Sequence, residues 1–147
     1  MNQKKETGIA LYMPNIVNVC VDEDENGELS GRIYHCYDEN PVPFANVIRM
    51  VESMEDLYDR IAFPQASTKT RVFSNTEKRT SGNKEKVKKA KDVAAQRGKL
   101  GTFLVNVRYR QNSSWQGEAE WVESGKIQQF VSVLELLKIL SNALEHV

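Results

Sequence analysis

Cysteine and histidine are the side chains of this protein best suited to bind a metal or attack a substrate. Cys20, His35 and Cys36 fall on a segment with the pattern of a β-hairpin, so they can approach one another. A structural zinc site normally needs four ligands, and adjacent strand residues such as His35 and Cys36 point to opposite faces. The same geometry argues against a cysteine–histidine nucleophile pair. We therefore expect free thiols and predict no catalytic residue, no metal ligand and no cofactor.

The acidic run DEDENG, which begins at Asp22, resembles the first half of a calcium-binding EF-hand loop. The full pattern requires a glutamate at the position of Ile33, and the flanking segments have the character of strands rather than helices. Asn26-Gly27 is instead a strong signal for a tight hairpin turn. The chain also has no glycine-rich phosphate loop, HExxH or GxSxG sequence. These patterns predict a protein that is not an enzyme.

Charge is distributed unevenly along the chain, although its net charge is zero. Residues 1–63 carry 5 basic and 12 acidic side chains, whereas residues 64–101 carry 11 basic and 3 acidic ones. A basic segment of this kind releases counterions from a phosphate backbone, so weakly selective nucleic-acid binding is our second hypothesis. Phe73 is the only aromatic residue in the segment, which leaves little for base stacking. The lysines proposed to carry this binding are Lys84, Lys86, Lys88, Lys89 and Lys91.

Two other interpretations of residues 64–101 stay open. The segment can be a soluble connector, or it can lie on the acidic residues 1–63 of the same or a neighbouring molecule. Asn83 and Gly98 suit the ends of a helix of about 14 residues, but few apolar residues lie between them. We expect this linker to be partly disordered or helical.

A polar turn with a tryptophan lies at 111–117, and such residues suit adaptable contacts with a partner. Its candidate partner-binding residues are Gln111, Asn112, Trp115 and Gln116. The alternative is a packing role for Trp115, because it occupies the place of Leu29 in an earlier, similar segment. Trp115 and Trp121 also share one face of the following strand, with small residues between them. A small-molecule pocket beside these two tryptophans is our third hypothesis.

The elements that must position these residues occur twice, 86 residues apart. Gly31 and Phe44 of the first copy are separated by 13 residues, as are Gly117 and Phe130 of the second. After each phenylalanine in the sequence, apolar residues recur at the spacing of a helix that buries one face. The matched apolar positions are Val47, Ile48, Val51, Met54 and Leu57 in the first copy, and Val133, Leu134, Leu137, Leu140 and Ala143 in the second.

Each copy is predicted to be a β-β-α unit, with Asn46 and Ser132 as the helix N-caps. Upstream, Val17-Asn18-Val19 resembles residues 105–107 at an offset of 88, which predicts a first hairpin two residues longer than the second. The predicted fold class is α+β: two β-β-α repeats forming antiparallel sheet, packed by two amphipathic helices and joined by a basic linker. The predicted divisions are an acidic first unit at 1–63, the linker at 64–101 and the second unit at 102–147.

The terminal helix, at about 132–146, has a wider apolar surface than one core-facing side needs. Leu136 and Ile139 widen it, where the first copy has Met50 and Ser53. This surface can be covered by the other unit of the same chain or by a second subunit, for example in a homodimer. Our first hypothesis is therefore a non-enzymatic binding or adaptor protein that acts through protein–protein or self-association contacts. Its candidate contact residues on this helix are Leu136, Ile139 and Leu140.

The length of 147 residues and an apolar fraction of 40% suit one domain, or two small ones that share a core. The chain has no 18-residue apolar run and its start is unlike a signal peptide, so we expect no membrane contact and a cytoplasmic location. The QN-x-x-WQG turn that begins at Gln111, followed by Phe130 and a leucine-rich helix, resembles a family of small Firmicutes proteins with no known activity. The block FPQASTKTRVF fits that family more loosely. The resemblance implies a cytoplasmic bacterial protein and adds no functional residue.

Overall fold

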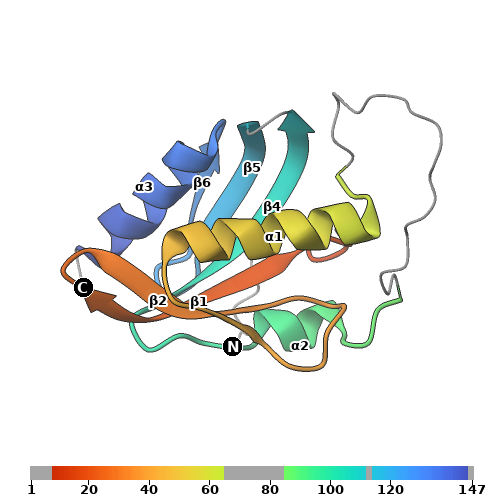
Figure 1. Ribbon diagram of the computed structural model, residues 1–147, viewed down its shortest axis with the longest axis horizontal. Coiled ribbons are helices and arrows are strands. Elements are labelled where there is room, and N and C mark those ends of the chain that lie inside the picture. Colours follow the sequence, from red (N-terminus) through yellow and green to blue (C-terminus); the bar gives the residue numbers. More distant parts are fainter. Residues whose placement is uncertain (1–7, 65–84, 112–113, 146–147) are drawn as a thin grey trace, which may run out of the picture.

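One antiparallel sheet of six strands organises the computed structural model, which describes residues 8–64, 85–111 and 114–145. The strands lie in the order β3-β2-β1-β4-β5-β6, and three described helices pack on them (Figure 1). The predicted α+β class is confirmed. The elements are β1 (Val17–Glu25), β2 (Glu28–Tyr34), β3 (Val42–Phe44), α1 (Val47–Ile61), α2 (Ala90–Ala94), β4 (Gly101–Gln111), β5 (Ser114–Trp121), β6 (Lys126–Phe130) and α3 (Val133–Leu144).

Three strands, not the predicted two, precede each of the helices α1 and α3. The additional strands are β3 and β6, which form the two edges of the sheet. Pro41 lies just before β3 and Pro43 lies within it. An edge strand has only one partner, so it tolerates a proline whose missing N–H would face solvent. Pro43 occupies this kind of position in β3.

The strand partners of Gly31 and Gly117 are also 86 residues apart, so the relation extends into the first strand of each half. Gly31 pairs with Val21, and Gly117 pairs with Val107. The predicted offset of 88 for these strands is therefore wrong. Both hairpins have the same length, because the terminal pairs are Glu25↔Glu28 in one and Gln111↔Ser114 in the other.

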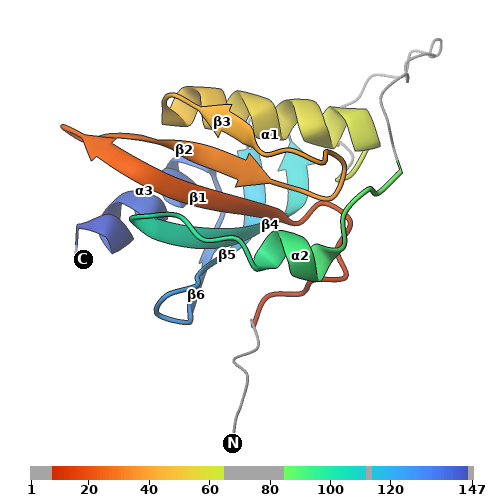
Figure 2. The same cartoon turned by 90° about the horizontal axis from the view of Figure 1, so that it is seen from below.

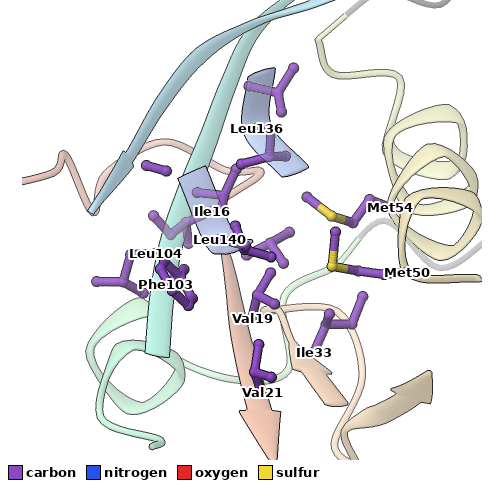
Figure 3. Close-up of a cluster of buried hydrophobic side chains, with 14 of the residues drawn as sticks. Ile16, Val19, Val21, Ile33, Met50, Met54, Phe103, Leu104, Leu136 and Leu140 are labelled. Atoms are coloured by element: carbon purple, nitrogen blue, oxygen red, sulfur yellow. The ribbon is translucent and has the colours of Figure 1, made fainter. Parts of the chain in front are cut away.

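A large part of the hydrophobic core lies between the sheet and the helices α1 and α3. The central strands β1 and β4 pair antiparallel, with Val19 opposite Phe103, so the two halves share one sheet. Cross-strand partners lie on the same face, which places Val19, Phe103 and Ile33 under the helices. Figure 3 shows Met50 and Met54 of α1 pointing toward Val19 and toward Leu140 of α3. Burial of these side chains holds the helices on the sheet.

The helices α1 and α3 begin where their capping residues predict. Asn46 accepts a hydrogen bond from the backbone N–H of Arg49 at 2.9 Å, and Ser132 accepts one from Glu135 at 3.1 Å. Both N-caps are confirmed. The Glu135 carboxylate accepts a hydrogen bond from the N–H of Val131, one residue before the cap, in a variant of the capping box.

The opposite face of the sheet is covered by α2 and by residues 8–15 (Figure 2). Two buried asparagines hold these segments. Asn18 donates its side-chain amide to the carbonyl oxygens of Val93 and Gln96, and Asn106 donates to that of Ala10. Within residues 85–98 only the five residues of α2 are helical, so the predicted helix of about 14 residues is wrong. The flanking backbone bonds to the sheet instead, as Leu100 does with Val21.

Candidate functional site

A polar cluster joins α1 to the hairpin of β4 and β5. Arg110 is only 4% exposed, and its Nη1 lies 2.7 Å from Glu55 and 2.9 Å from Asp59. Its Nε donates to the carbonyl oxygen of Pro64 at 2.8 Å. The guanidinium thus bonds to α1 and to the chain that follows it, and such charge-assisted bonds fix relative position strongly.

Trp115 belongs to this cluster and to the core. It is fully buried, and its Nε1 donates to the second carboxylate oxygen of Glu55. Its ring meets that of Tyr58 edge-on, with centroids 5.6 Å apart. Burial raises the pKa of Tyr58, whose hydroxyl has no hydrogen-bond partner among the described residues. These contacts give Trp115 a packing role between the two halves.

The other described residues predicted in the polar turn differ from Trp115 in exposure. Gln111 and Gln116 are exposed at the end of the hairpin. Asn112 lies outside the described residues. The turn therefore presents two glutamines, while its tryptophan points into the core.

The two cysteine thiols are buried and weakly reactive. Cys20 and Cys36 are free thiols, fully buried on the sheet and the loop after β2. Burial raises the pKa of Cys20 to about 11, against the opposing effect of the neighbouring Arg32, and it also raises the pKa of Cys36. Both thiols are protonated at neutral pH and are weak nucleophiles. Among the described residues, no group of three or more His, Cys, Asp or Glu is placed to hold a metal ion.

The described part of the basic segment, residues 85–100, lies on residues 1–63 of the same chain. The carbonyl oxygen of Cys36 accepts hydrogen bonds from Val87 and Lys88. Lys88 is half-buried, and its Nζ reaches the carbonyl oxygen of Glu39 at 3.4 Å. The other described lysines of the predicted nucleic-acid site, Lys86, Lys89 and Lys91, are exposed. Lys84 lies outside the described residues.

The predicted contact residues of the terminal helix do not share one environment. Leu136 and Leu140 are fully buried against the sheet, so neither is open to a partner while α3 holds this position. Ile139 is half-buried at the side of the helix near β6. The wide apolar surface is covered within the chain, by the sheet and by the side chains of α1 (Figure 3).

The two edges of the sheet differ in their protection. The edge strand β3 has three residues and contains Pro43, whereas β6 has five residues and no proline. Within the described ranges β6 pairs with β5 alone. Pro43 of β3 lies opposite Arg32, and Gln129 of β6 lies opposite Glu118. Gln129 is therefore the equivalent of Pro43 at the offset of 86 residues. Because a proline in an edge strand occupies a position whose N–H faces solvent, the N–H of Gln129 points away from β5.

A pocket of about 260 Å³ opens between β6 and α3. Its lining residues are Trp121, Lys126, Gln128, Ile139, Asn142 and Ala143. The Nε1 of Trp121 is buried and has no hydrogen-bond partner in the described part of the chain. The pocket contains one of the two predicted tryptophans and not Trp115, which lies in the polar cluster.

Sequence reasoning missed β6 and the pocket side chains that it carries. The sequence did contain a signal for the strand, namely Gly125. In the structure, residues 122–125 form a turn that ends at this glycine, whose φ is 76°. A glycine there permits the chain to reverse after Trp121 and brings Lys126 back beside it. Nothing in the spacing of the sequence indicates that α3 lies over this pair.

In comparisons with known proteins, no family model, curated protein or solved structure matches the chain. The resemblance to small Firmicutes proteins stays a prediction. No helix among the described residues is long and apolar enough to cross a membrane.

Proposed function

We propose that this protein is a non-enzymatic binding or adaptor protein that adds an extended segment of a partner protein to the edge of its sheet, along β6. The open edge is the observation that carries the proposal. An unpaired edge strand offers a row of backbone donors and acceptors, and extended peptides bind such edges as an additional strand. Five residues of β6 give a paired length of about 17 Å.

The contrast between the two edges supports β6 rather than β3 as the docking strand. Natural proteins protect edges with short strands and proline, and β3 has both features. On β6, Lys126 is the only charged residue, and no second strand of the described residues pairs with the outer side of β6, where the N–H of Gln129 lies. A sheet that protects one edge and leaves the other open is suited to binding at the open one.

A single extended segment suits this edge better than a second copy of the chain. Obligate homodimers usually bury about 2,000 Å² or more, with an apolar centre. Among the described residues, the large exposed apolar side chains on β6, after it and at the start of α3 are Ile127, Val131 and Leu134. Three such side chains beside a short strand fit a narrow peptide contact. Self-association is tested directly, by light scattering of the unliganded protein.

We also infer that the two halves are copies of one βββα unit, in which the second copy retained the binding edge. Equal register at Gly31↔Phe44 and Gly117↔Phe130 supports this, as do the N-caps at equivalent positions. Duplication would allow one edge to be closed by Pro43 while the other stays available to a partner.

Selection from peptide libraries tests the proposed function. The purified protein is used to select binders from displayed random octapeptides, and the selected peptides are titrated by isothermal calorimetry. Gln129→Pro removes the outward N–H and should weaken peptide binding by at least about tenfold, which corresponds to about 1.4 kcal/mol. Gln129→Ala, which keeps the N–H, should bind as the wild type does.

Circular dichroism of both variants verifies that the sheet is intact. Failure to select any peptide, or equal affinity of Gln129→Pro and Gln129→Ala, would refute strand addition along β6.

Nucleic-acid binding through the basic segment is a second candidate, favoured by the exposed side chains of Lys86, Lys89 and Lys91. Asp92 lies among them, and residues 85–100 contain no aromatic side chain for stacking. Fluorescence anisotropy with labelled DNA and RNA across a salt series measures it. The test variant replaces Lys84, Lys86, Lys88, Lys89 and Lys91 by glutamine. Loss of a salt-dependent signal in this variant, with peptide binding retained, would separate the two functions.

A further inference from the structure

We propose that the pocket between β6 and α3 binds the C-terminal carboxylate of the added peptide, so that the protein recognises free C-termini of its partners. This inference rests on the proposed strand addition along β6. It assigns a class of ligand to the pocket, which the backbone pairing of an added strand would not occupy by itself.

Strand direction places a C-terminus at the pocket. All strand pairs of the sheet are antiparallel, and antiparallel pairing is slightly more stable per residue. Lys126 is the first residue of β6, so a strand that runs antiparallel to β6 ends beside Lys126. Lys126 also lines the pocket. A parallel peptide would instead bring its N-terminal ammonium group to this lysine, and the two like charges would repel.

The lining chemistry suits an anion. Lys126 supplies a cation, and Gln128 and Asn142 supply amides that can donate. No aspartate or glutamate lines the pocket. Trp121 adds an indole N–H that is buried without a partner among the described residues, and such a donor is costly to leave unsatisfied. A carboxylate oxygen is an acceptor of the kind that the Trp121 N–H lacks among the described residues.

The size of the pocket indicates a terminal residue rather than a larger ligand. Its volume of about 260 Å³ lies just below the range of about 300–1,000 Å³ that is typical of sites for drug-sized molecules. Ile139 and Ala143 form an apolar part of the lining that a final aliphatic side chain can contact.

The first half of the chain lacks these groups at the matching positions. At the offset of 86 residues, Lys126 corresponds to Asn40 and Asn142 corresponds to Asp56. The first half therefore has no cation at this place and has an acidic side chain instead. At these matched positions, the cation is present beside β6 and absent beside β3.

The experiment compares two forms of each octapeptide selected with the purified full chain, one with a free C-terminal carboxylate and one with an amidated C-terminus. Calorimetry gives both affinities, and we expect amidation to weaken binding by at least about tenfold. Lys126→Gln should weaken the carboxylate form and leave the amidated form unchanged, which removes most of the difference. Lys138→Gln is the control, because Lys138 is exposed on α3 and does not line the pocket.

The two tryptophans provide a site-specific readout in ¹⁵N NMR. The indole signal of Trp121 should shift when the carboxylate peptide binds. That of Trp115, which already donates to Glu55, should stay in place. Sodium acetate alone, at the same concentration, should leave the Trp121 signal unchanged.

The outcomes separate this inference from the proposed function. Equal affinity for both peptide forms would overturn C-terminal recognition and leave strand addition standing. A shift of the Trp121 signal by acetate, with no difference between the two peptide forms, would assign the pocket to small carboxylates and also overturn the inference. Absence of any peptide binding would refute both proposals.

Discussion

Gly31 and Gly117 lie 86 residues apart and hold the same position, each in the middle strand of three. At both sites the preceding strand approaches so closely that a Cβ atom would overlap a backbone carbonyl oxygen. The oxygen belongs to Cys20 at the first site and to Asn106 at the second. Neither glycine has a positive φ, so close approach of the backbone, not an unusual conformation, is what requires glycine here.

Alanine at either glycine should therefore destabilise the protein. Because the clashing atom is backbone rather than a flexible side chain, we expect Gly31→Ala and Gly117→Ala each to lower the free energy of unfolding by about 1–3 kcal/mol. Urea denaturation measures the loss. Ser30→Ala, one residue before Gly31, is the control and should change stability by less than about 0.5 kcal/mol. Wild-type stability in both glycine variants would contradict the close approach.

Arg108 and Arg110 lie two residues apart on β4 and make ion pairs in different environments. Arg108 is exposed and pairs with Glu118, whereas Arg110 is buried and bonds to Glu55 and Asp59. Exposed pairs contribute about 0–1 kcal/mol, whereas a buried hydrogen bond to a charged group contributes about 1.5–3 kcal/mol.

Arg110→Met should consequently lower the free energy of unfolding by about 2–3 kcal/mol, against less than about 1 kcal/mol for Arg108→Met. Thermal and urea unfolding of the two variants, measured side by side, test the difference. Equal losses would mean that the polar cluster between α1 and the β4–β5 hairpin contributes no more than a surface pair.

His35 should make stability dependent on pH in the mildly acidic range. Its pKa is lowered from 6.5 to about 4, chiefly by burial and to a smaller extent by Arg60, against the opposing effect of the nearby Asp38. The unfolded chain therefore binds a proton at higher pH than the folded protein does. Stability is unaffected above about pH 6.5 and falls as the pH decreases from there to about 4, by up to about 1.4 kcal/mol per pH unit.

The variant His35→Asn isolates this contribution. Its side-chain oxygen can accept the backbone hydrogen bond that Tyr37 now donates to Nδ1 of His35, and it does not titrate. Urea unfolding between pH 7 and pH 4 should show a shallower pH dependence for the variant. Identical slopes for the two proteins would exclude His35 as the source.

Local features of the fold could be predicted from the sequence because they depend on neighbouring residues. Asn46 and Ser132 cap their helices through bonds to residues three positions later, and Asn26-Gly27 forms its turn with positive φ at both residues. The interval from Gly117 to Phe130 also reflects a local pairing, that of β5 with β6.

The candidate site could not be predicted because it depends on contacts between distant segments. Lys126 and Trp121 meet Asn142 only because α3 lies over the β5–β6 edge. Similarly, the burial of Trp115 depends on Glu55, 60 residues earlier in the chain. Periodicity identifies an apolar surface but does not identify which segment covers it.

Leu134 and Leu136 of the terminal helix test the difference between being apolar in the sequence and being buried in the fold. Both residues are leucine on α3, yet Leu134 is 61% exposed and Leu136 is fully buried. Leu136→Ala should lower the free energy of unfolding by about 2–5 kcal/mol, because it leaves a cavity under the helix. Leu134→Ala should change it by less than about 0.5 kcal/mol. If α3 instead served as a subunit interface through Leu136, its truncation would dissociate an oligomer in light scattering and leave the monomer as stable as before.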